Sequence, residues 1–163
     1  MLNPKQPKMK IEEKIKKAQK AWAEGLINIG KAAVSKPHKV EKRANDMLDD
    51  LYDFRIGCKT EILFKPTLAS DHPFRISREE TLSYFIGGLY NEDKGFALKP
   101  WKHVKFKKFH FIEHNDQVFV MGAYTFIDYQ GNKTKVDYTF GYQIDDRSDD
   151  LKIFLHHSSL RFQ

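Results

Sequence analysis

Histidine and serine side chains gather near the end of the chain, at residues 156–159, after an apolar run that starts at Leu151. Histidine exchanges protons near neutral pH, and serine hydroxyls donate hydrogen bonds to developing negative charge. Because side chains alternate between the faces of a strand, His157 and Ser159 should share the apolar face with Leu151, with the other histidine and serine opposite. The pattern predicts that His157 and Ser159 form the polar floor of a pocket. Two hydrogen-bonded polar residues at a fraying strand end are the alternative.

The composition indicates one globular domain with an aromatic-rich interior. The chain has 163 residues, of which 40% are hydrophobic, and it contains 13 Phe and 7 Tyr. The formal net charge is +6, and lysines gather at residues 5–20 and 99–108. Such clusters suit an acidic partner, but a solvated strand face is the commoner use of the second cluster, so we expect no nucleic-acid partner.

The single cysteine, Cys58, excludes an intramolecular disulfide and a cysteine-based metal cage. No apolar run reaches the roughly 20 residues of a membrane span, and residues 1–10 lack the apolar region of a signal peptide. We therefore expect no membrane span and a cytoplasmic location, or a periplasmic or secreted location if a native leader was removed.

Helices occupy the first third of the chain. Apolar residues recur every three or four positions from Ile11 to Ala33 in a background rich in lysine and glutamate. After a break at Pro37, a second amphipathic pattern runs from Val40 to a helix stop at Gly57. The apolar stripe of the first helix is suited to packing against the domain or a partner subunit.

Two short elements follow the helices. Residues 61–69 read as an extended segment, and Pro66 places it at a sheet edge or in a loop. Ser77 and Glu80 have the spacing of a capping box, which predicts a helix over residues 78–86 that stops at Gly87.

The hydrophobic period changes to two from Trp101 onward. A phase shift at residues 107–108 predicts a β-bulge, and further strands are expected at residues 118–129, 134–144 and 151–160. Helices followed by four long antiparallel strands are an α+β pattern. A curved, mainly antiparallel sheet wrapped around the helices would leave a pocket at one end.

Several short motifs stand out between residues 63 and 160, namely Leu63-Phe64-Lys65-Pro66-Thr67-Leu68-Ala69, Phe74-Arg75, Leu82-Ser83-Tyr84-Phe85, Gly95-Phe96-Ala97, Pro100-Trp101, Met121-Gly122, Lys135-Val136-Asp137-Tyr138-Thr139-Phe140-Gly141-Tyr142 and His156-His157-Ser158-Ser159-Leu160. Together they resemble the iota class of carbonic anhydrases over about residues 51–160. The order of elements is also similar to the cone-shaped α+β barrel of the nuclear transport factor two-like (SnoaL-like) superfamily. We therefore expect a cone-shaped α+β barrel domain at residues 36–163, preceded by a basic amphipathic helix at residues 1–35, which is a variable part of the family.

The resemblance implies reversible hydration of carbon dioxide to bicarbonate, in a pocket that is metal-free in some lineages of the family. Its motifs place the threonine, tyrosine and serine of that pocket at Thr67, Tyr84 and Ser159. A turn cap for Thr67 and a core-edge position for Tyr84 are the structural alternatives.

Three further residues are candidates for roles in such a site. His157 lies on the same predicted face as Ser159, and its unperturbed pKa of about 6.5 makes it our candidate proton acceptor, with ionised Tyr84 as the alternative. Arg75 and Tyr138 are candidate substrate-binding residues. A surface salt bridge and sheet packing are their more common uses.

A metal site is the less favoured form of this pocket. Several members of the family carry three histidines before the paired serines, and here Leu155 stands in place of the first. Adjacent His156 and His157 point to opposite faces of a strand, whereas zinc normally takes three or four converging ligands. We therefore expect no metal cofactor, with zinc or manganese as the less favoured alternative.

Two other functions stay open at the level of sequence. An enzyme like ketosteroid isomerase needs a carboxylate that faces the cavity, and on the last two strands only Asp137 is placed mid-strand. A non-catalytic module for ligand binding or oligomerisation would use the same cone as a scaffold. In each case, apolar residues on the outer face of the sheet, Phe119, Met121 and Ile127, predict a homodimer.

Overall fold

Helices and strands follow one another as an α+β chain in the computed structural model, which describes residues 8–55 and 61–163. The expected helix stop at Gly57 and the single cysteine, Cys58, lie outside the described residues. The elements are α1 (Ile11–Ser35), the short helix η1 (Pro37–Lys39), α2 (Val40–Leu51), β1 (Leu63–Lys65), α3 (Arg78–Ile86), β2 (Trp101–His114), β3 (Gln117–Asp128), β4 (Lys133–Ile144) and β5 (Leu151–Leu160).

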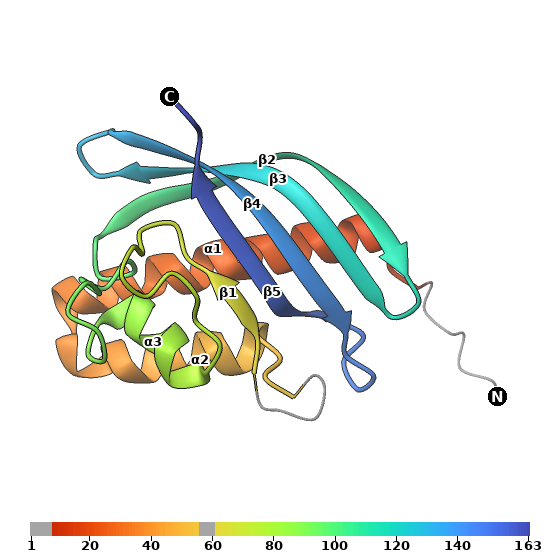
Figure 1. Ribbon diagram of the computed structural model, residues 1–163, viewed down its shortest axis with the longest axis horizontal. Coiled ribbons are helices and arrows are strands. Elements are labelled where there is room, and N and C mark those ends of the chain that lie inside the picture. The colour runs from red at the N-terminus through yellow and green to blue at the C-terminus, as the bar shows by residue number, and fades with distance from the viewer. Residues whose placement is uncertain (1–7, 56–60) are drawn as a thin grey trace.

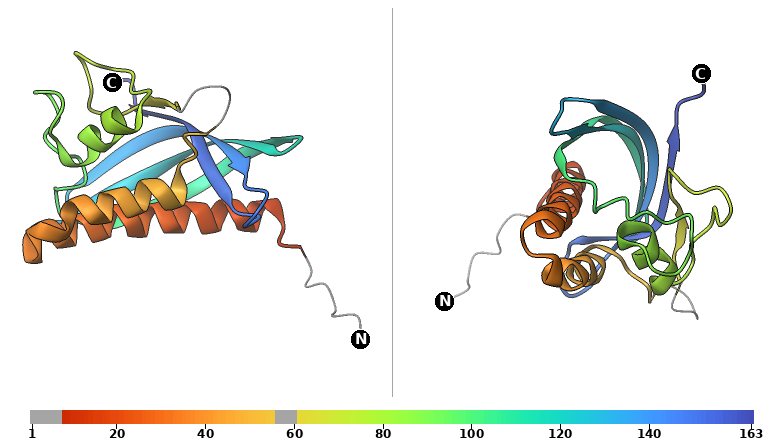
Figure 2. Two further views of the ribbon diagram at one scale, coloured as in Figure 1. Left: turned by 90° about the horizontal axis from the view of Figure 1, so that it is seen from below. Right: turned by 90° about the vertical axis from the view of Figure 1, so that its left-hand side faces the viewer.

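One five-stranded sheet carries the fold, in the order β1-β5-β4-β3-β2. The four long strands pair antiparallel, and β1 pairs parallel with β5. The sheet curves over α1 and α2, which cover its concave face (Figures 1 and 2). The prediction of a curved, mainly antiparallel sheet wrapped around helices is confirmed, and β1 lies at a sheet edge, as Pro66 indicated.

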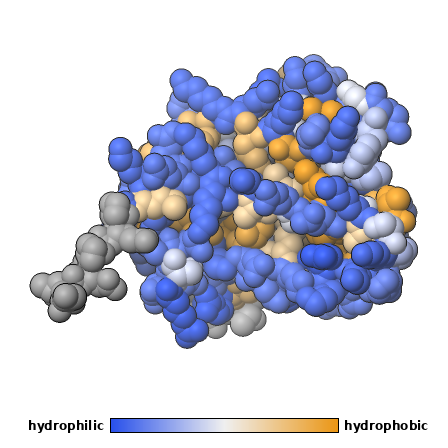
Figure 3. All heavy atoms as spheres, turned by 180° about the vertical axis from the view of Figure 1, so that it is seen from behind, coloured by the Kyte–Doolittle hydropathy of each residue, from blue (hydrophilic) through white to orange (hydrophobic). Residues whose placement is uncertain are grey.

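The long helix α1 supplies the centre of the core. Its inner side buries Trp22, Leu26 and Ile29, while most of its lysines and glutamates face solvent. From behind, on the side of α1, the surface is mostly hydrophilic with an apolar band across its middle (Figure 3). The indole ring of Trp22 lies within 6.4 Å, between ring centroids, of aromatic rings from α3 and three strands, namely Phe85, Phe106, Phe126 and Phe140.

The second helix ends earlier than its apolar pattern predicts. It stops at Leu51, and the backbone of Tyr52 is extended. The N–H of Asp53 then donates to the carbonyl of Ile153 at 2.8 Å, and Tyr52 forms a bridge with the same residue. Pairing with β5 therefore replaces the last helical turns, because it satisfies the same backbone groups.

The third helix begins and ends where the sequence predicts. The Ser77 hydroxyl accepts a hydrogen bond from the N–H of Glu80 at 3.1 Å, and the Glu80 carboxylate accepts one from the N–H of Ser77 at 2.9 Å. This reciprocal capping box fixes the first turn. The helix stops at Gly87, whose φ of +81° is accessible to glycine at little cost. Tyr84 is thereby directed into the interior.

Two strands contain bulges. The predicted bulge in β2 is confirmed, since its register with β3 shifts between Phe106 and Phe109. A further bulge lies in β5, where Ile153 and Leu155 pair with adjacent residues of β4, so that Phe154 is the extra residue. An added residue reverses the alternation of side chains beyond it.

The bulge in β5 overturns the predicted faces of the terminal residues. Leu151 and Ile153 face the core as expected, but beyond Phe154 the inward side chains are His156 and Ser158. The prediction that His157 and Ser159 face the pocket is therefore wrong, because simple alternation does not hold across an extra residue.

Gly141 leaves the space that this bulge needs. A methyl group at its position would lie 2.9 Å from both the Cβ of Leu155 and the Cζ of Phe154. Such distances are shorter than van der Waals contact, so a side chain there would push β5 away from β4.

We predict that Gly141→Ala destabilises the fold by about 1–3 kcal/mol, as overpacking of an interior does. Urea unfolding followed by tryptophan fluorescence would measure the loss. Gly131→Ala is the matched control for handling of a glycine variant, since nothing lies within 4 Å of the added methyl group and only its φ of +86° is strained. A Gly141→Ala variant as stable as the wild type would contradict the proposed role of this contact.

Candidate active site

A small cavity lies in the interior, where β1, α3, β3 and β5 meet. Its volume is about 10 Å³, close to the smallest space that holds one water molecule. Aromatic rings form most of the wall, and the polar groups are hydroxyls and one imidazole. The cavity is lined by Trp22, Phe64, Pro66, Thr67, Tyr84, Phe85, Phe96, Tyr124, His156 and Ser158.

A wider cleft adjoins this inner cavity and leads to solvent. It has a volume of about 650 Å³, and Thr67, Tyr84 and Phe96 line both spaces. Leu68, Leu98 and Leu160 make most of the outer cleft apolar, with Lys94 and Lys99 among its lining residues. We call this cleft the vestibule. The inner cavity is therefore reached past two hydroxyl-bearing side chains.

A chain of hydrogen bonds runs from α1 to the cavity. The indole N–H of Trp22 donates to the Tyr52 hydroxyl at 3.0 Å, and that hydroxyl lies 3.0 Å from Nδ1 of His156. Nε2 of His156 is 2.9 Å from Oγ of Ser158, which is 2.5 Å from the hydroxyl of Tyr124. Four elements, α1, the segment after α2, β3 and β5, thus contribute to one buried polar network.

The indole N–H of Trp22 fixes which group donates in each of the next two hydrogen bonds of the network. An indole can only donate, so Tyr52 accepts from Trp22 and directs its single hydroxyl hydrogen at Nδ1 of His156. The opposite arrangement would leave that hydrogen buried without a partner. Nδ1 is then an acceptor, and the neutral ring carries its hydrogen on Nε2 and donates it to Ser158. One hydroxyl hydrogen of the Ser158–Tyr124 pair stays free for a ligand.

Burial keeps His156 neutral. The side chain is 2% exposed and stacks on Phe64, with ring centroids 4.7 Å apart. Loss of hydration lowers the pKa of His156 to about 3, with a smaller contribution from the neighbouring His157. Because Nδ1 is also occupied by Tyr52, this imidazole orients Ser158 and is not available as a proton acceptor.

The two tyrosines of the cavity are held in their protonated form. Burial raises the pKa of Tyr84 and of Tyr124 well above the usual value. The Tyr84 oxygen accepts a hydrogen bond from the N–H of Leu68 at 3.3 Å. This bond and a hydrogen bond with the Thr67 side chain lower the pKa of Tyr84, but burial has the larger effect. The cavity therefore presents hydroxyl donors at neutral pH.

Arg75 does not reach the cavity. Its side chain is fully buried, and its guanidinium forms ion pairs with Asp93 at 2.6 Å and Glu92 at 3.2 Å. The Glu92 carboxylate also accepts from the backbone N–H groups of three consecutive residues starting at Ser70. The placement of Arg75 at the substrate is wrong, because both carboxylates engage its charge. It joins the loop after β1, which carries Thr67, to the loop after α3.

Other predicted residues also lie away from the cavity. His157 is exposed on the outer face of the sheet, and Ser159 is half-buried there, paired with Asp137 across the strands. The Asp137 carboxylate forms an ion pair with Arg161 at 3.1 Å. The Tyr138 hydroxyl faces inward but accepts a hydrogen bond from Gln19 at 2.8 Å. The carboxylate that an isomerase site would require therefore faces outward, and among the described residues no carboxylate lines the inner cavity.

Sequence reasoning missed His156, Ser158 and Tyr124. The glycine at position 141 was a usable signal, since an isolated glycine in a strand often marks a bulge or a close approach. Two adjacent large apolar residues, Phe154 and Leu155, were a second signal. Together they could have shown that the alternation of β5 changes before the histidines.

Within residues 8–55 and 61–163, no group of three or more His, Cys, Asp or Glu side chains could hold a metal ion. No helix in these ranges is long and apolar enough to cross a membrane.

A cone of α+β structure around a small ring-lined cavity defines the NTF2-like class of folds. A protein of that family from Streptomyces avermitilis has this fold, with a TM-score of 0.57 at 15% identity over 93% of this chain and 96% of the other. At that identity the likeness concerns the fold alone.

Sequence comparison then identifies the family. The profile of the metal-independent carbonic anhydrase (MICAH) family matches residues 13–160. A metal-independent carbonic anhydrase of Nostoc sp. strain PCC 7120 is 38% identical over 156 residues, covering 93% of this chain and 74% of the relative. The crystal structure of the iota-carbonic anhydrase from a cyanobacterium, complexed with bicarbonate, has a TM-score of 0.88 at 34% identity, covering 100% and 99% of the two chains. The chain belongs to the metal-independent carbonic anhydrases.

The two neighbouring histidines allow a direct test of which face carries the site. We predict that His156→Gln lowers carbon dioxide hydration about 100-fold, because Ser158 loses its fixed orientation, and costs about 1–3 kcal/mol of stability. His157→Gln, on the solvent side, should stay within about twofold of the wild type in activity and about 0.5 kcal/mol in stability. Stopped-flow assays and urea unfolding measure both. The reverse ranking of the two variants would refute the assignment.

Burial of neutral His156 also predicts a pH dependence of stability. The folded-state pKa of about 3 lies below the unfolded value near 6.5, so the unfolded chain binds more protons between these pH values. This residue therefore makes stability fall as pH drops from 6.5 towards 3, by up to about 1.4 kcal/mol per pH unit. Urea unfolding across this window should show a shallower slope for His156→Gln than for the wild type. Identical slopes would mean that His156 is charged in the folded protein.

Proposed function

We propose that reversible hydration of carbon dioxide to bicarbonate takes place in the inner cavity without a metal ion, with Thr67, Tyr84, Tyr124 and Ser158 as the residues that contact the substrate. The observation that carries this proposal is the buried hydrogen-bond chain that ends in a free hydroxyl hydrogen inside a cavity of small volume. A ligand oxygen can accept this hydrogen, and the vestibule, which shares Thr67 and Tyr84 with the cavity, supplies the room that the rest of a small substrate needs.

The walls and the hydroxyls of the cavity suit the two sides of the reaction. Carbon dioxide has no net charge, so rings such as Phe64, Phe85 and Phe96 can surround it at little cost. As water attacks the carbon, negative charge grows on the oxygens. The hydroxyls of Thr67, Tyr84 and Ser158 can donate hydrogen bonds to them, which stabilises bicarbonate and the preceding transition state. Binding of bicarbonate by a relative with a TM-score of 0.88 supports this substrate class.

The proton released by the attacking water needs a route that avoids His156. The unprotonated ring nitrogen, Nδ1, already accepts a hydrogen bond from Tyr52, and the pKa of about 3 makes His156 a poor proton acceptor. Thr67 and Tyr84 line both the cavity and the vestibule, and each hydroxyl can accept one proton while it donates another. We therefore assign proton release to these two hydroxyls and to solvent or buffer in the vestibule, with no charged side chain as an intermediate.

Paired serines provide a matched test of this site. We predict that Ser158→Ala lowers kcat/KM for carbon dioxide hydration by about 100-fold or more, the usual effect of removing one donor to a developing oxyanion. Ser159→Ala, on the outer face, should stay within about twofold of the wild type. Tyr84→Phe should lose activity as Ser158→Ala does, since it removes a donor and a relay group. Stopped-flow hydration with a pH indicator measures all three.

The same assay tests independence from metal. Protein treated with a chelator, with metal content checked by mass spectrometry, should retain its full rate. A rate lost on chelation and restored by zinc or manganese would contradict the metal-free mechanism. Equal losses in Ser158→Ala and Ser159→Ala would contradict the choice of strand face instead.

The outer face of the sheet supports the proposal of a homodimer. Four apolar side chains at one end of this face, Ile112, Phe119, Met121 and Phe154, form what we call the apolar patch. Met121 is 64% exposed, and the rings of Phe119 and Phe154 lie 6.0 Å apart. Burial of such a surface favours association of two copies, because apolar groups leave water.

Substitution of the central methionine tests this arrangement. We predict that Met121→Asp converts the homodimer into a monomer, because a dimer would bury two unpaired carboxylates. Size-exclusion chromatography with light scattering measures the mass. Val34→Asp, at an exposed apolar residue of α1 away from this face, is the control for added charge and should keep the mass of the dimer. A wild-type protein of monomer mass would refute the proposal.

A further inference from the structure

A second hollow lies on the outer face of the sheet, away from the cavity and the vestibule. Its volume is about 400 Å³, within the range of small-ligand sites. The floor is made by short or half-buried side chains of β3, Ala123, Thr125 and Ile127. Four lysines and one arginine stand around it, namely Lys105, Lys107, Lys133, Lys135 and Arg161. We call this feature the basic hollow.

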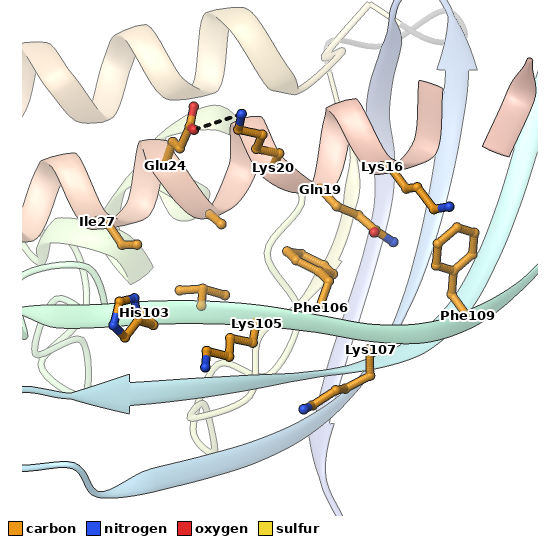
Figure 4. A pocket seen from close by; sticks show the side chains of 12 residues that line it. Lys16, Gln19, Lys20, Glu24, Ile27, His103, Lys105, Phe106, Lys107 and Phe109 are labelled. Atoms are coloured by element: carbon orange, nitrogen blue, oxygen red, sulfur yellow. Dashed lines mark ion pairs between the residues drawn. The ribbon is translucent and has the colours of Figure 1, made fainter. Parts of the chain in front are cut away.

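Strand register explains how the cations come to surround the floor. Lys105 on β2 and Lys135 on β4 both pair with Thr125 on β3, so the three residues form one row across the sheet. Strand spacing then places the backbones of the two lysines about 10 Å apart. Lys105 and Lys107 point away from α1, while Phe106 between them points towards it (Figure 4).

The lysines of the basic hollow have no counter-charge. Arg161 is paired with Asp137, but within residues 8–55 and 61–163 none of the four lysines forms an ion pair. Like charges gathered around one hollow repel one another and reduce the stability of the folded chain. A bound anion would remove this repulsion.

Protection of a sheet edge does not account for this arrangement. Lysines on an edge strand commonly prevent unwanted strand pairing, and that could explain Lys105 and Lys107 on β2. Lys133 and Lys135 lie on β4, which has a neighbour on each side, so the edge argument does not apply to them.

Thr125 lies on the floor of the basic hollow, between the two rows of lysines. The residue is 7% exposed and lines the hollow. A hydroxyl can donate a hydrogen bond to an anionic oxygen as well as accept one. A ligand oxygen held between the lysine rows would therefore meet one neutral donor as well as the charged ones.

We infer that the basic hollow binds a small organic or inorganic polyanion, whose phosphate or carboxylate groups bridge the lysines of β2 and β4 over Thr125. The lysines are spread around the rim, which suits a ligand with two or more anionic groups rather than one. The site lies on the other side of the sheet from the proposed catalytic cavity: Tyr124 borders both spaces, but its hydroxyl bonds to Ser158 in the cavity, whereas the Thr125 side chain next to it faces the basic hollow. A protein that binds no anion in the basic hollow could still have the proposed enzyme activity.

Calorimetric titration of the full chain with pyrophosphate and, separately, with citrate tests this inference and distinguishes phosphate from carboxylate ligands. At low ionic strength we expect saturable binding of at least one of the two at one site per chain. Binding should weaken as salt is raised, because exposed charges are screened over about 10 Å at 0.1 M. Lys105→Gln with Lys135→Gln should weaken binding at least about tenfold, and Thr125→Val should weaken it without any change of charge.

The control variant removes the same number of positive charges far from the basic hollow. Lys31→Gln with Lys39→Gln, on the helical side, should bind as the wild type does. Equal weakening in both double variants would show a general effect of net charge and would overturn the inference. No saturable binding of either anion by the wild type would overturn it as well. So would a change of oligomeric mass in Lys105→Gln with Lys135→Gln, since the lysines would then serve a second copy of the chain.

Discussion

The extra residue Phe154 in β5 is the constraint on which the site depends. Without it, regular alternation would turn His156 and Ser158 to solvent and leave the hydroxyl hydrogen of Tyr52 without its buried acceptor. Gly141 permits the bulge because the neighbouring strand has no side chain at the point of closest approach. One local irregularity thus decides which polar groups the cone encloses.

Enclosure in turn decides what kind of chemistry is possible. The core that surrounds His156 is aromatic and shielded from solvent, and this burial lowers the pKa of the imidazole and raises the pKa of the tyrosines. The residues that remain are neutral donors in fixed positions. Catalysis in such a site rests on preorganised hydrogen bonds to the substrate, and the apolar rings strengthen these bonds by excluding water.

Local signals in the sequence predicted the local structure well. Ser77 and Glu80 gave the start of α3, the phase shift at residues 107–108 gave the bulge in β2, and strand periodicity gave the curved sheet. Thr67 and Tyr84 were found through family motifs and do meet at the cavity. The predictions that were wrong depend on contacts between residues that are far apart in the sequence. Pairing with Ile153 ends α2, two distant carboxylates engage Arg75, and the bulge opposite Gly141 reverses His157 and Ser159.

The hydrogen-bond chain has a polarity that its first member cannot reverse. Since the indole of Trp22 never accepts, Tyr52 donates to His156 and His156 donates to Ser158, which leaves one hydroxyl hydrogen of the Ser158–Tyr124 pair without a partner in the network. The site therefore distinguishes small molecules by their lone pairs. A ligand with an exposed oxygen can accept this hydrogen, whereas a ligand without a lone pair leaves it unpaired. This selectivity originates in the N-terminal helix, far along the chain from the strand that contacts the ligand.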